Sequence, residues 1–538
     1  MISNAARIQF LLKIALIIAA VLEVVIEPEF TNLACVAIIF ASSWLTLSYI
    51  LRERFLNDNP LSALMILGFN LTSQAGALIF QAVAIRPVTF NLAVPVDTFA
   101  TLALSQVTFI LAHEAWRRMG MFRRASAILG HAVFKPLGLF RTPTTTQLWM
   151  LGLVGIMAIW STKVQRGAAV GDLVVYGDTW GKFVDAMNFL AFAPMLIPIL
   201  HFFNPDFRAP KSGRLAFALV GYFLLLVATA FAQNIRGTFV IAIVLPVLIF
   251  ATAFLLGRVP FNRRIFTRVV GGAILGVFML GLVSDLAVAM VIARDRRFEV
   301  SGLEIMNNTI DNFMDKALLE RYRSLQRTLI FGQGYNELYV ENPVISRFVT
   351  PKFHDNTLAS IEKLNVAYRS VVWDATELKL VSLLPTPMLT ALGVVLDKKE
   401  LEYSFGDYFN ELASGGGGQF FLGGFRTGST IAHGLFLFGN WVYPVLFLSA
   451  LCIFTVFNGL VLRTAGGSVM AMLALLQLWD IVSISLQLDS MVDLVSLLVR
   501  KLPQQIFIFF VLFALMRFAA WPFRSSRAPE LQRIAPGR

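Results

Sequence analysis

The feature that most constrains this chain is a series of apolar blocks, each about twenty residues long, separated by short polar segments. A helix of about twenty residues crosses the ~30 Å hydrocarbon layer of a bilayer. The 538-residue sequence is 57% hydrophobic and only 14% charged, whereas soluble domains carry roughly 25% charged residues. A soluble protein of this size could not bury so much apolar surface in one core. The sequence therefore predicts an all-α polytopic membrane protein.

The apolar blocks predict about twelve transmembrane helices. They cover residues 8–26, 31–51, 61–85, 92–113, 146–162, 184–203, 215–233, 236–257, 269–292, 434–462, 466–486 and 503–521. Loops rich in Lys and Arg alternate with poorer ones, so the positive-inside rule places both termini in the cytoplasm. These basic loops account for the net charge of +12, and nucleic-acid binding is not indicated.

One long polar segment, residues 293–432, interrupts the apolar pattern. Long connections of this kind are usually functional or disordered, and this one contains helix-like pieces. We expect spans one to nine in residues 1–292 and a mostly helical cap in 293–432. The last three spans follow in 433–522, and a cytoplasmic tail in 523–538. The charge rule places the cap outside, in the periplasm of a cell with two membranes.

Motifs for cofactor chemistry are missing from the sequence. It has no phosphate-binding GxxxxGK[ST], no GxGxxG after a strand, no HExxH and no GxSxG. The five histidines are scattered, and Cys35 and Cys452 lie in apolar blocks, so no metal site or disulfide framework is predicted. If the protein is an enzyme, its substrate arrives already activated.

Basic residues at the outer ends of spans are the candidate functional groups. Arg236 sits in the very short connection between spans seven and eight, where an Arg is costly without a partner. Its planar fork suits a phosphate or a carboxylate, although an Arg at a tight hairpin can also extend toward the interface. Arg297 follows span nine, where interfacial anchoring is the alternative role.

Two further segments carry candidate groups. The first lies between Pro343 and Asn356, whose prolines would orient Arg347 and Lys352 on a rigid turn, next to His354 and Asp355. The second follows four glycines and contains Arg426, Ser429 and His433, which would lie near one face if a helix starts at Ser429. An ordinary exposed turn is the alternative for the first segment.

Three short motifs accompany this layout: Arg236-Gly237, the run from Pro343 to Lys352, and Gly428-Ser429 with Ala432 and Gly439. Together they resemble the Wzy-type O-antigen and exopolysaccharide repeat-unit polymerases of the O-antigen polymerase/ligase superfamily. The sequence departs from that family at His433, where an acidic residue is expected.

The resemblance implies a C-type, metal-independent glycosyltransferase of the bacterial inner membrane. Such an enzyme moves a growing glycan from undecaprenyl diphosphate onto a sugar hydroxyl of an incoming lipid-linked repeat unit. It would act in lipopolysaccharide or exopolysaccharide biosynthesis, with a flippase and a chain-length co-polymerase as partners, in contact with membrane lipid and without a cofactor. We expect Arg236, Arg347, Arg426 and His433 to be the catalytic residues. We expect Lys352, His354, Asp355, Arg297 and Ser429 to bind the substrate.

Two other functions remain open. An O-antigen ligase, which transfers glycan to the lipid A core, has a similar layout with a His and an Arg in its large loop. A non-enzymatic polysaccharide flippase or transporter would instead be expected to place charged pairs near the middle of the bilayer and to lack a large outer cap. A catalytic base is also unassigned, with His433, His354, Asp355 or none as the alternatives.

Overall fold

The computed structural model describes most of the chain. The described residues are 3–164, 179–204, 206–208, 210, 212–294, 301–331, 335–398, 400–401, 403–415, 426–464, 467–484 and 488–519. Nearly all regular elements in these ranges are helices, and one two-stranded antiparallel sheet accompanies them. The prediction of an all-α membrane protein is confirmed at this level.

Nine helical segments among the described residues are long and apolar enough to cross a bilayer. They are α1 (Asn4–Ile26), α2 (Phe30–Ile50), α4–η1–α5 (Pro60–Ala84), α6 (Pro95–Arg118), α10 (Gly213–Ala232), α11 (Gly237–Leu255), α12 (Arg263–Ala293), α19–η9–α20 (Thr430–Gly459) and α24–η10–α25 (Met491–Phe518). Within them, η1 spans Leu71–Ala75, η9 spans Gly439–Trp441 and η10 spans Leu497–Lys501.

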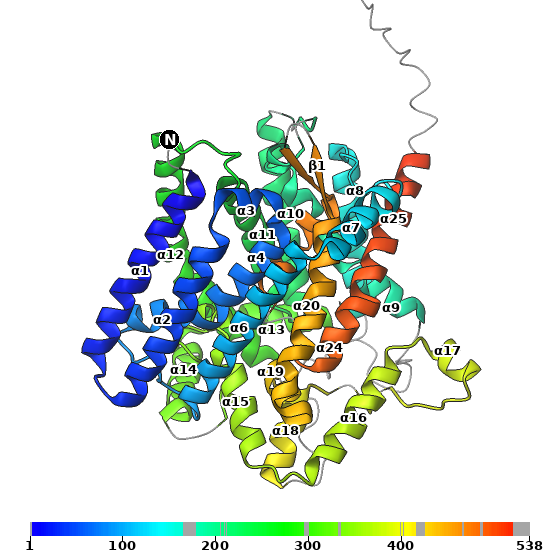
Figure 1. The fold of residues 1–538 in the computed structure, drawn as a ribbon. Helices are drawn as coiled ribbons and strands as arrows, with labels where there is room; N and C mark the ends of the chain where they lie inside the picture. Colours follow the sequence, from blue (N-terminus) through cyan, green and yellow to red (C-terminus); the bar gives the residue numbers. More distant parts are fainter. Residues whose placement is uncertain are drawn as a thin grey trace, which may run out of the picture.

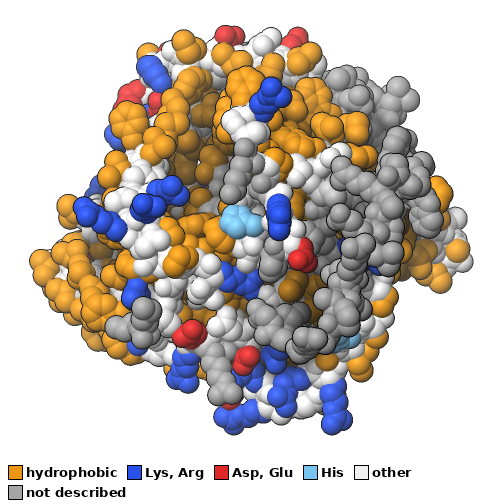
Figure 2. All heavy atoms as spheres, turned by 90° about the horizontal axis from the view of Figure 1, so that it is seen from above, with side chains coloured by type: hydrophobic (Ala, Val, Ile, Leu, Met, Phe, Trp, Pro, Cys, Tyr) orange, Lys and Arg blue, Asp and Glu red, His pale blue; other side chains and the backbone are white. Residues whose placement is uncertain are grey.

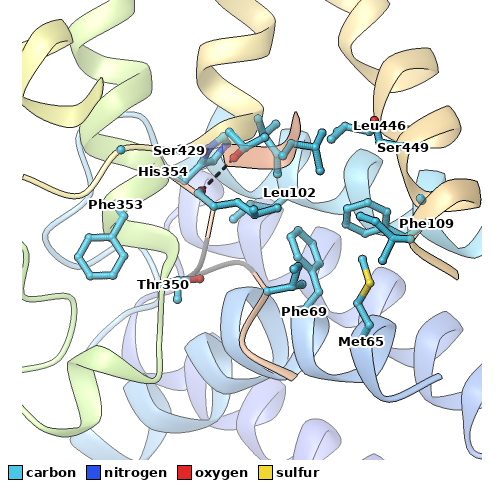
Figure 3. A pocket seen from close by; sticks show the side chains of 18 residues that line it. Met65, Phe69, Leu102, Phe109, Thr350, Phe353, His354, Ser429, Leu446 and Ser449 are labelled. Carbon is cyan, nitrogen blue, oxygen red and sulfur yellow. Dashed lines mark hydrogen bonds between the residues drawn. The ribbon is translucent and has the colours of Figure 1, made fainter. Parts of the chain in front are cut away.

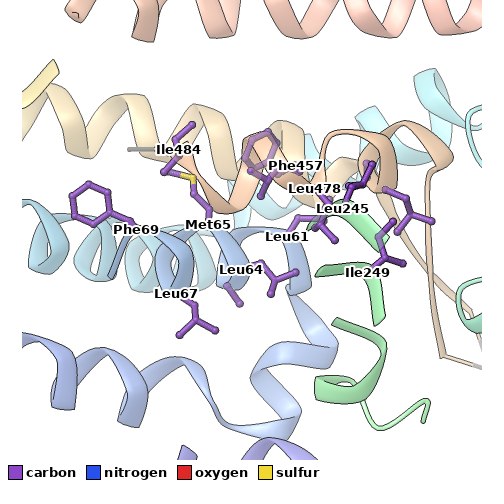
Figure 4. Close-up of a cluster of buried hydrophobic side chains, with 14 of the residues drawn as sticks. Leu61, Leu64, Met65, Leu67, Phe69, Leu245, Ile249, Phe457, Leu478 and Ile484 are labelled. Atoms are coloured by element: carbon purple, nitrogen blue, oxygen red, sulfur yellow. The ribbon is translucent and has the colours of Figure 1, made fainter. Parts of the chain in front are cut away.

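The centre of the bundle is helix α4 (Pro60–Asn70), in which every residue is buried. Its leucines and phenylalanine pack against α11, α20 (Val442–Gly459) and α22 (Leu478–Val482), as Figure 4 shows for Leu61, Phe457 and Leu245. By contrast, α12 lies at the periphery, where Phe278 is 82% exposed. An apolar side chain that is exposed on a spanning helix has lipid as its natural neighbour.

Two predicted spans are not long continuous helices. Residues 184–203 form the 3₁₀ turns η5 (Asn188–Leu196) and η6 (Leu200–Phe202), with Pro194 inside the first. Proline removes a helical hydrogen bond and clashes with the preceding turn. The predicted span 146–162, by contrast, lies within a continuous helical run, in which α8 (Thr145–Ile159) passes directly into the π-helical turn η3 (Trp160–Val164); α9 (Thr179–Asp185) follows later in the chain. The count of twelve spans stays a prediction.

The second of these predicted spans, 466–486, is corrected by the structure. Its first residues form strand β2 (Gly467–Met470), which pairs with β1 (Val461–Thr464) in the register Val461–Met470 and Thr464–Gly467. Two short helices follow, α21 (Met472–Leu476) and α22. The residues before the predicted span 503–521 contribute α24 (Met491–Ser496) and η10 to the last spanning segment.

The described residues between α12 and α19, called the cap from here on, form mostly helices. They are α13 (Gly302–Met314), α14 (Lys316–Phe331), η8 (Ile345–Arg347), α15 (Pro351–Glu362), α16 (Tyr368–Ser382), α17 (Thr386–Ala391) and α18 (Phe405–Ser414). Helices α15 to α18 lie at the end of the molecule opposite the N-terminus (Figure 1).

The other end of the molecule is basic. Figure 2 views this end and shows many Lys and Arg side chains but few acidic ones. The connections on this side include α3 (Glu53–Asp58), α7 (Gly120–Ile128) and η2 (Leu129–Phe134). Their neighbourhood carries the exposed basic residues Arg52, Arg118, Arg123, Arg124, Lys135, Arg141, Arg263 and Arg264. The cap and the basic loops therefore mark opposite ends of the bundle.

Candidate functional site: an arginine-lined cavity

The connection between α10 and α11 presents Arg236. The chain leaves α10 at Gln233, and Asn234 then takes a left-handed conformation with φ of 51°. Asn is among the few residues that tolerate this region, because its short side chain can bond locally. The reversal places Arg236 directly before the first turn of α11, as the residue that caps the helix. Helix α11 therefore begins at the predicted Arg-Gly motif.

Arg236 shares a cavity of about 400 Å³ with two other arginines, Arg294 and Arg347. Arg294 caps the C-terminus of α12, and Arg347 ends the short helix η8 of the cap. Three segments that are far apart in the sequence thus bring their guanidinium groups to one hollow. The remaining lining residues are mostly apolar. They include Phe239, Val240 and Ile241 from α11, Val283 and Ala287 from α12, Pro343, Val344 and Phe348 from the cap, and Trp479 from α22.

The electrostatics of this cavity favour an anion. Burial, and then the charges of Arg347 and Arg294, lower the pKa of Arg236 to about 9, while Glu337 acts in the opposite direction. Among the described residues, no hydrogen bond or ion pair engages the guanidinium group of Arg236. A guanidinium stays charged at neutral pH, so Arg236 carries its positive charge beside two other arginines, and a negatively charged ligand would be attracted to it.

Arg347 is held in place without being fully neutralised. Its Nη2 lies 3.2 Å from Glu337 Oε2, and its guanidinium lies over the ring of Phe353 at 5.5 Å. The side chain of Arg347 is 44% exposed. An ion pair at this exposure contributes little stability, so its role is to orient Arg347 rather than to hold the fold.

Asn234 also lines the cavity, and its buried side-chain amide has no hydrogen-bond partner among the described residues. The residue is 1% exposed, and neither its Oδ1 nor its Nδ2 has a partner among the described residues. A buried amide without partners costs about 1–3 kcal/mol. Such a group is expected where a ligand completes the hydrogen bonds.

Arg426 does not reach this cavity. Its backbone N–H donates to Asp407 Oδ1 at 3.0 Å, its Nη1 lies 3.5 Å from the same oxygen, and the guanidinium stacks over Tyr335 at 4.8 Å. Because Asp407 is fully buried, this pair fixes the loop before α19 to α18.

Lys352 and Asp355 form a buried structural unit. Lys352 Nζ lies 3.0 Å from Asp355 Oδ2. The carboxylate of Asp355 also accepts hydrogen bonds from the backbone N–H groups of Ala93 and Val94 at 2.9 Å. These bonds attach α15 to the start of α6, so the predicted substrate-binding pair is occupied in positioning the cap.

His354 and Ser429 face each other beside a small apolar cavity, shown in Figure 3. His354 Nδ1 lies 2.7 Å from Ser429 Oγ, and its Nε2 lies 2.7 Å from Thr101 Oγ1. Burial lowers the pKa of His354 to about 3, so the ring is neutral. Ser429 also caps α19 (Thr430–Phe438), as predicted. The cavity holds only about 50 Å³, which is small for a sugar.

His433 is enclosed in a separate cluster. Its Nδ1 accepts a hydrogen bond from the Met491 N–H at 3.2 Å, and its Nε2 lies 3.0 Å from Thr376 Oγ1. The ring stacks on Phe405 with centroids 4.1 Å apart. Both ring nitrogens are therefore occupied, and the predicted catalytic role of His433 receives no support from its position. Arg297, the remaining candidate, lies outside the described residues.

Of the nine predicted site residues, the structure places Arg236 and Arg347 in the arginine-lined cavity, and it pairs Lys352 with Asp355 and His354 with Ser429 elsewhere. It adds Arg294 and Asn234, which the sequence reasoning did not select. One feature of the sequence could have indicated Asn234: it is a polar residue in a connection between two apolar blocks that is too short to form an exposed loop. No group of three or more His, Cys, Asp or Glu residues in the described ranges could hold a metal ion. Comparison with family models, with curated proteins and with solved structures gives no match.

Proposed function

We propose that this protein polymerises undecaprenyl-diphosphate-linked oligosaccharide repeat units at the outer face of the bacterial inner membrane. The observation that supports the proposal is the convergence of Arg236, Arg294 and Arg347 on a cavity whose other lining residues are mostly apolar and include faces of α11 and α12. A lipid diphosphate likewise combines a highly charged head with an apolar chain, so the head would suit the arginines and the chain would suit the apolar walls. Guanidinium groups bind phosphate oxygens through two parallel hydrogen bonds.

In this mechanism the three arginines hold the diphosphate of the donor, and the isoprenoid chain follows the apolar walls. A hydroxyl of the acceptor sugar attacks the anomeric carbon of the donor glycan. The bond from that carbon to the diphosphate oxygen breaks, and its electron pair stays on the diphosphate. The hydroxyl proton leaves to the released diphosphate or to solvent. Preorganised cations aimed at the developing charge are the main source of rate enhancement in such a step.

Arg236 is the group that this mechanism needs most, because it is unpaired among the described residues and central to the cavity. We expect Arg236→Ala to leave the protein in the membrane and to reduce polymer formation at least about 100-fold, the usual cost of removing one such donor. The measurement is the length and amount of glycan in a deletion strain complemented with each variant.

The matched control is Arg86→Ala. Arg86 is also an arginine outside the spans, but it pairs with Glu341 at 3.1 Å on an exposed surface. Its loss should have little effect. Normal polymer in the Arg236 variant would overturn the proposal.

The deletion strain also separates the alternatives. A polymerase defect leaves single repeat units on the lipid carrier, whereas a ligase defect leaves long polymer on undecaprenyl diphosphate. A flippase defect leaves the repeat unit on the cytoplasmic side of the membrane, where an impermeant glycan-modifying reagent does not reach it.

A further inference from the structure

A second and larger chamber adjoins the arginine cavity. It has a volume of about 500 Å³ and lies between η5, α11, α22 and the start of α25 (Leu502–Ala519). The arginine cavity and the second chamber share four lining residues, which are Ile235, Gly237, Ile241 and Trp479. A Cβ built on Gly237 would meet only Ile235 Cγ2, at 3.9 Å. Gly237 therefore leaves space beside both chambers where any other residue would place a side chain.

The walls of the second chamber differ in chemistry from those of the first. They carry the carboxamides of Asn188, Gln233, Gln477, Gln504 and Gln505. The charged groups are of both signs and partly paired, since Lys501 Nζ lies 2.9 Å from Asp480 Oδ2 and Asn188 Nδ2 donates to Asp185 Oδ1 at 2.7 Å. The aromatic rings of Phe189, Phe192 and Trp479 complete the lining.

Two of these amides have buried acceptor atoms with no partner among the described residues, Gln505 Oε1 and Asn188 Oδ1. Gln505 is only 7% exposed, so bulk water does not readily donate a hydrogen bond to its Oε1. An unpaired buried carboxamide costs about 1–3 kcal/mol. A ligand that both donates and accepts hydrogen bonds would relieve this cost, because an amide offers one acceptor and two donors.

We propose that this chamber binds a neutral carbohydrate, namely the acceptor sugar whose hydroxyl attacks the donor held in the arginine cavity. Hydroxyl groups complement carboxamides in both donor and acceptor roles, and the aromatic rings offer apolar faces to a sugar ring. A chamber of this volume falls within the ~300–1,000 Å³ range of small-molecule sites. The assignment of the sugar as acceptor rests on the proposed polymerase function, whereas carbohydrate binding itself does not.

Trp479 has a positioning role in this arrangement. It lines both hollows and packs edge-on against Phe348, with ring centroids 5.7 Å apart. Phe348 directly follows Arg347 and itself lines the arginine cavity. The indole thus lies between the diphosphate head and the acceptor, where it sets the approach of one substrate to the other.

The test uses the purified full-length protein and two probes. The first is the oligosaccharide pool released by mild acid from the membrane lipids of the source cells, and the second is undecaprenyl diphosphate. Retention of each is measured by native mass spectrometry for wild type, Gln505→Leu and Arg236→Ala. We expect Gln505→Leu to lose at least about 10-fold in oligosaccharide retention, the loss of one or two hydrogen bonds, and to keep undecaprenyl diphosphate. Arg236→Ala should show the reverse.

Stability separates a binding role from a structural one. Replacing an unpaired buried amide by an apolar side chain of similar shape is close to neutral or stabilising, so the melting temperature of Gln505→Leu should equal or exceed that of wild type. If wild type retains no oligosaccharide, or Gln505→Leu retains as much, the carbohydrate site is refuted. Retention of the sugars without undecaprenyl diphosphate would instead refute the proposed function and leave the chamber as a glycan site.

Discussion

At the scale of single residues, Asn234 combines two costs that the fold alone does not require. Its backbone lies in the left-handed region, which is unfavourable for residues with a Cβ. Its amide is buried in the arginine cavity without partners among the described residues. Strain of this kind persists where the surrounding structure enforces it, and it is concentrated at functional sites. We interpret Asn234 as a residue that binds the same ligand as Arg236.

Substitutions at Asn234 separate its backbone role from its side-chain role. Asn234→Gly keeps the left-handed turn at no steric cost, so its melting temperature should stay close to that of wild type while polymer formation falls about 10-fold or more through the lost hydrogen bonds. Asn234→Ala loses the same amide and adds strain of about 1 kcal/mol, so it should also be less stable. Full activity in the stable glycine variant would show that the amide binds no substrate.

Residue patterns predicted part of this site and not the rest. Arg236 and Arg347 were identified because a fixed Arg at a helix end or a proline-bounded turn needs a partner. Arg426 was selected on the same basis, yet it pairs with Asp407, a residue 19 positions earlier in the chain whose approach depends on the fold of the cap. The sequence around His433 gave no sign that Met491 and Thr376 would occupy both ring nitrogens. Which side chains pair depends on the tertiary structure, and a single sequence does not reveal it.

At the scale of elements, apolar block length predicted the long helices well and the broken ones poorly. Segments that are buried on all sides are apolar whether they form one helix or several short pieces. Residues 461–484 illustrate this, since a hairpin and two short helices are as hydrophobic as a span. The difference comes from close packing: a Cβ on Gly68 of α4 would lie 2.0 Å from the carbonyl oxygen of Val482. No hydropathy pattern encodes such a contact.

The attachment of the cap to the spans relies on another close approach, at Gly428. Its N–H donates to the side chain of Asp489, whose other oxygen accepts from the Phe405 N–H at 2.8 Å. A Cβ on Gly428 would lie 2.4 Å from Asp489 Oδ1 and 2.7 Å from the Asp489 carbonyl oxygen. The loop before α19, helix α18 and the loop before α24 thus meet with no room for a side chain.

We therefore expect Gly428→Ala to loosen the cap and to lower the free energy of unfolding by about 1–3 kcal/mol, as in other overpacked sites. The measurements are the melting temperature in detergent and the rate of proteolytic cleavage within the cap. Gly120→Ala is the control, because nothing lies within 4 Å of a Cβ built at Gly120. Equal stability of the two variants would contradict this account of how the cap is anchored.

At the scale of the whole molecule, the distribution of charge predicts on which side of the membrane the arginine cavity lies. The basic connections lie at one end of the bundle and the cap at the other (Figures 1 and 2). Positively charged loops remain on the cytoplasmic side during insertion. The cap, and with it Arg347 and the arginine cavity, would then lie on the outer side, where a lipid-linked glycan is presented after translocation.

This orientation can be tested on intact cells with single cysteines. The native Cys35 and Cys452 are first replaced by serine, and a cysteine is then placed either at Val395, which is 100% exposed in the cap, or at Arg124, which is exposed at the basic end. A membrane-impermeant maleimide should label the cysteine at 395 in intact cells and the one at 124 only after the membrane is opened. The reverse pattern would place the cap in the cytoplasm, and glycan polymerisation at the outer face would then be physically impossible for this cavity.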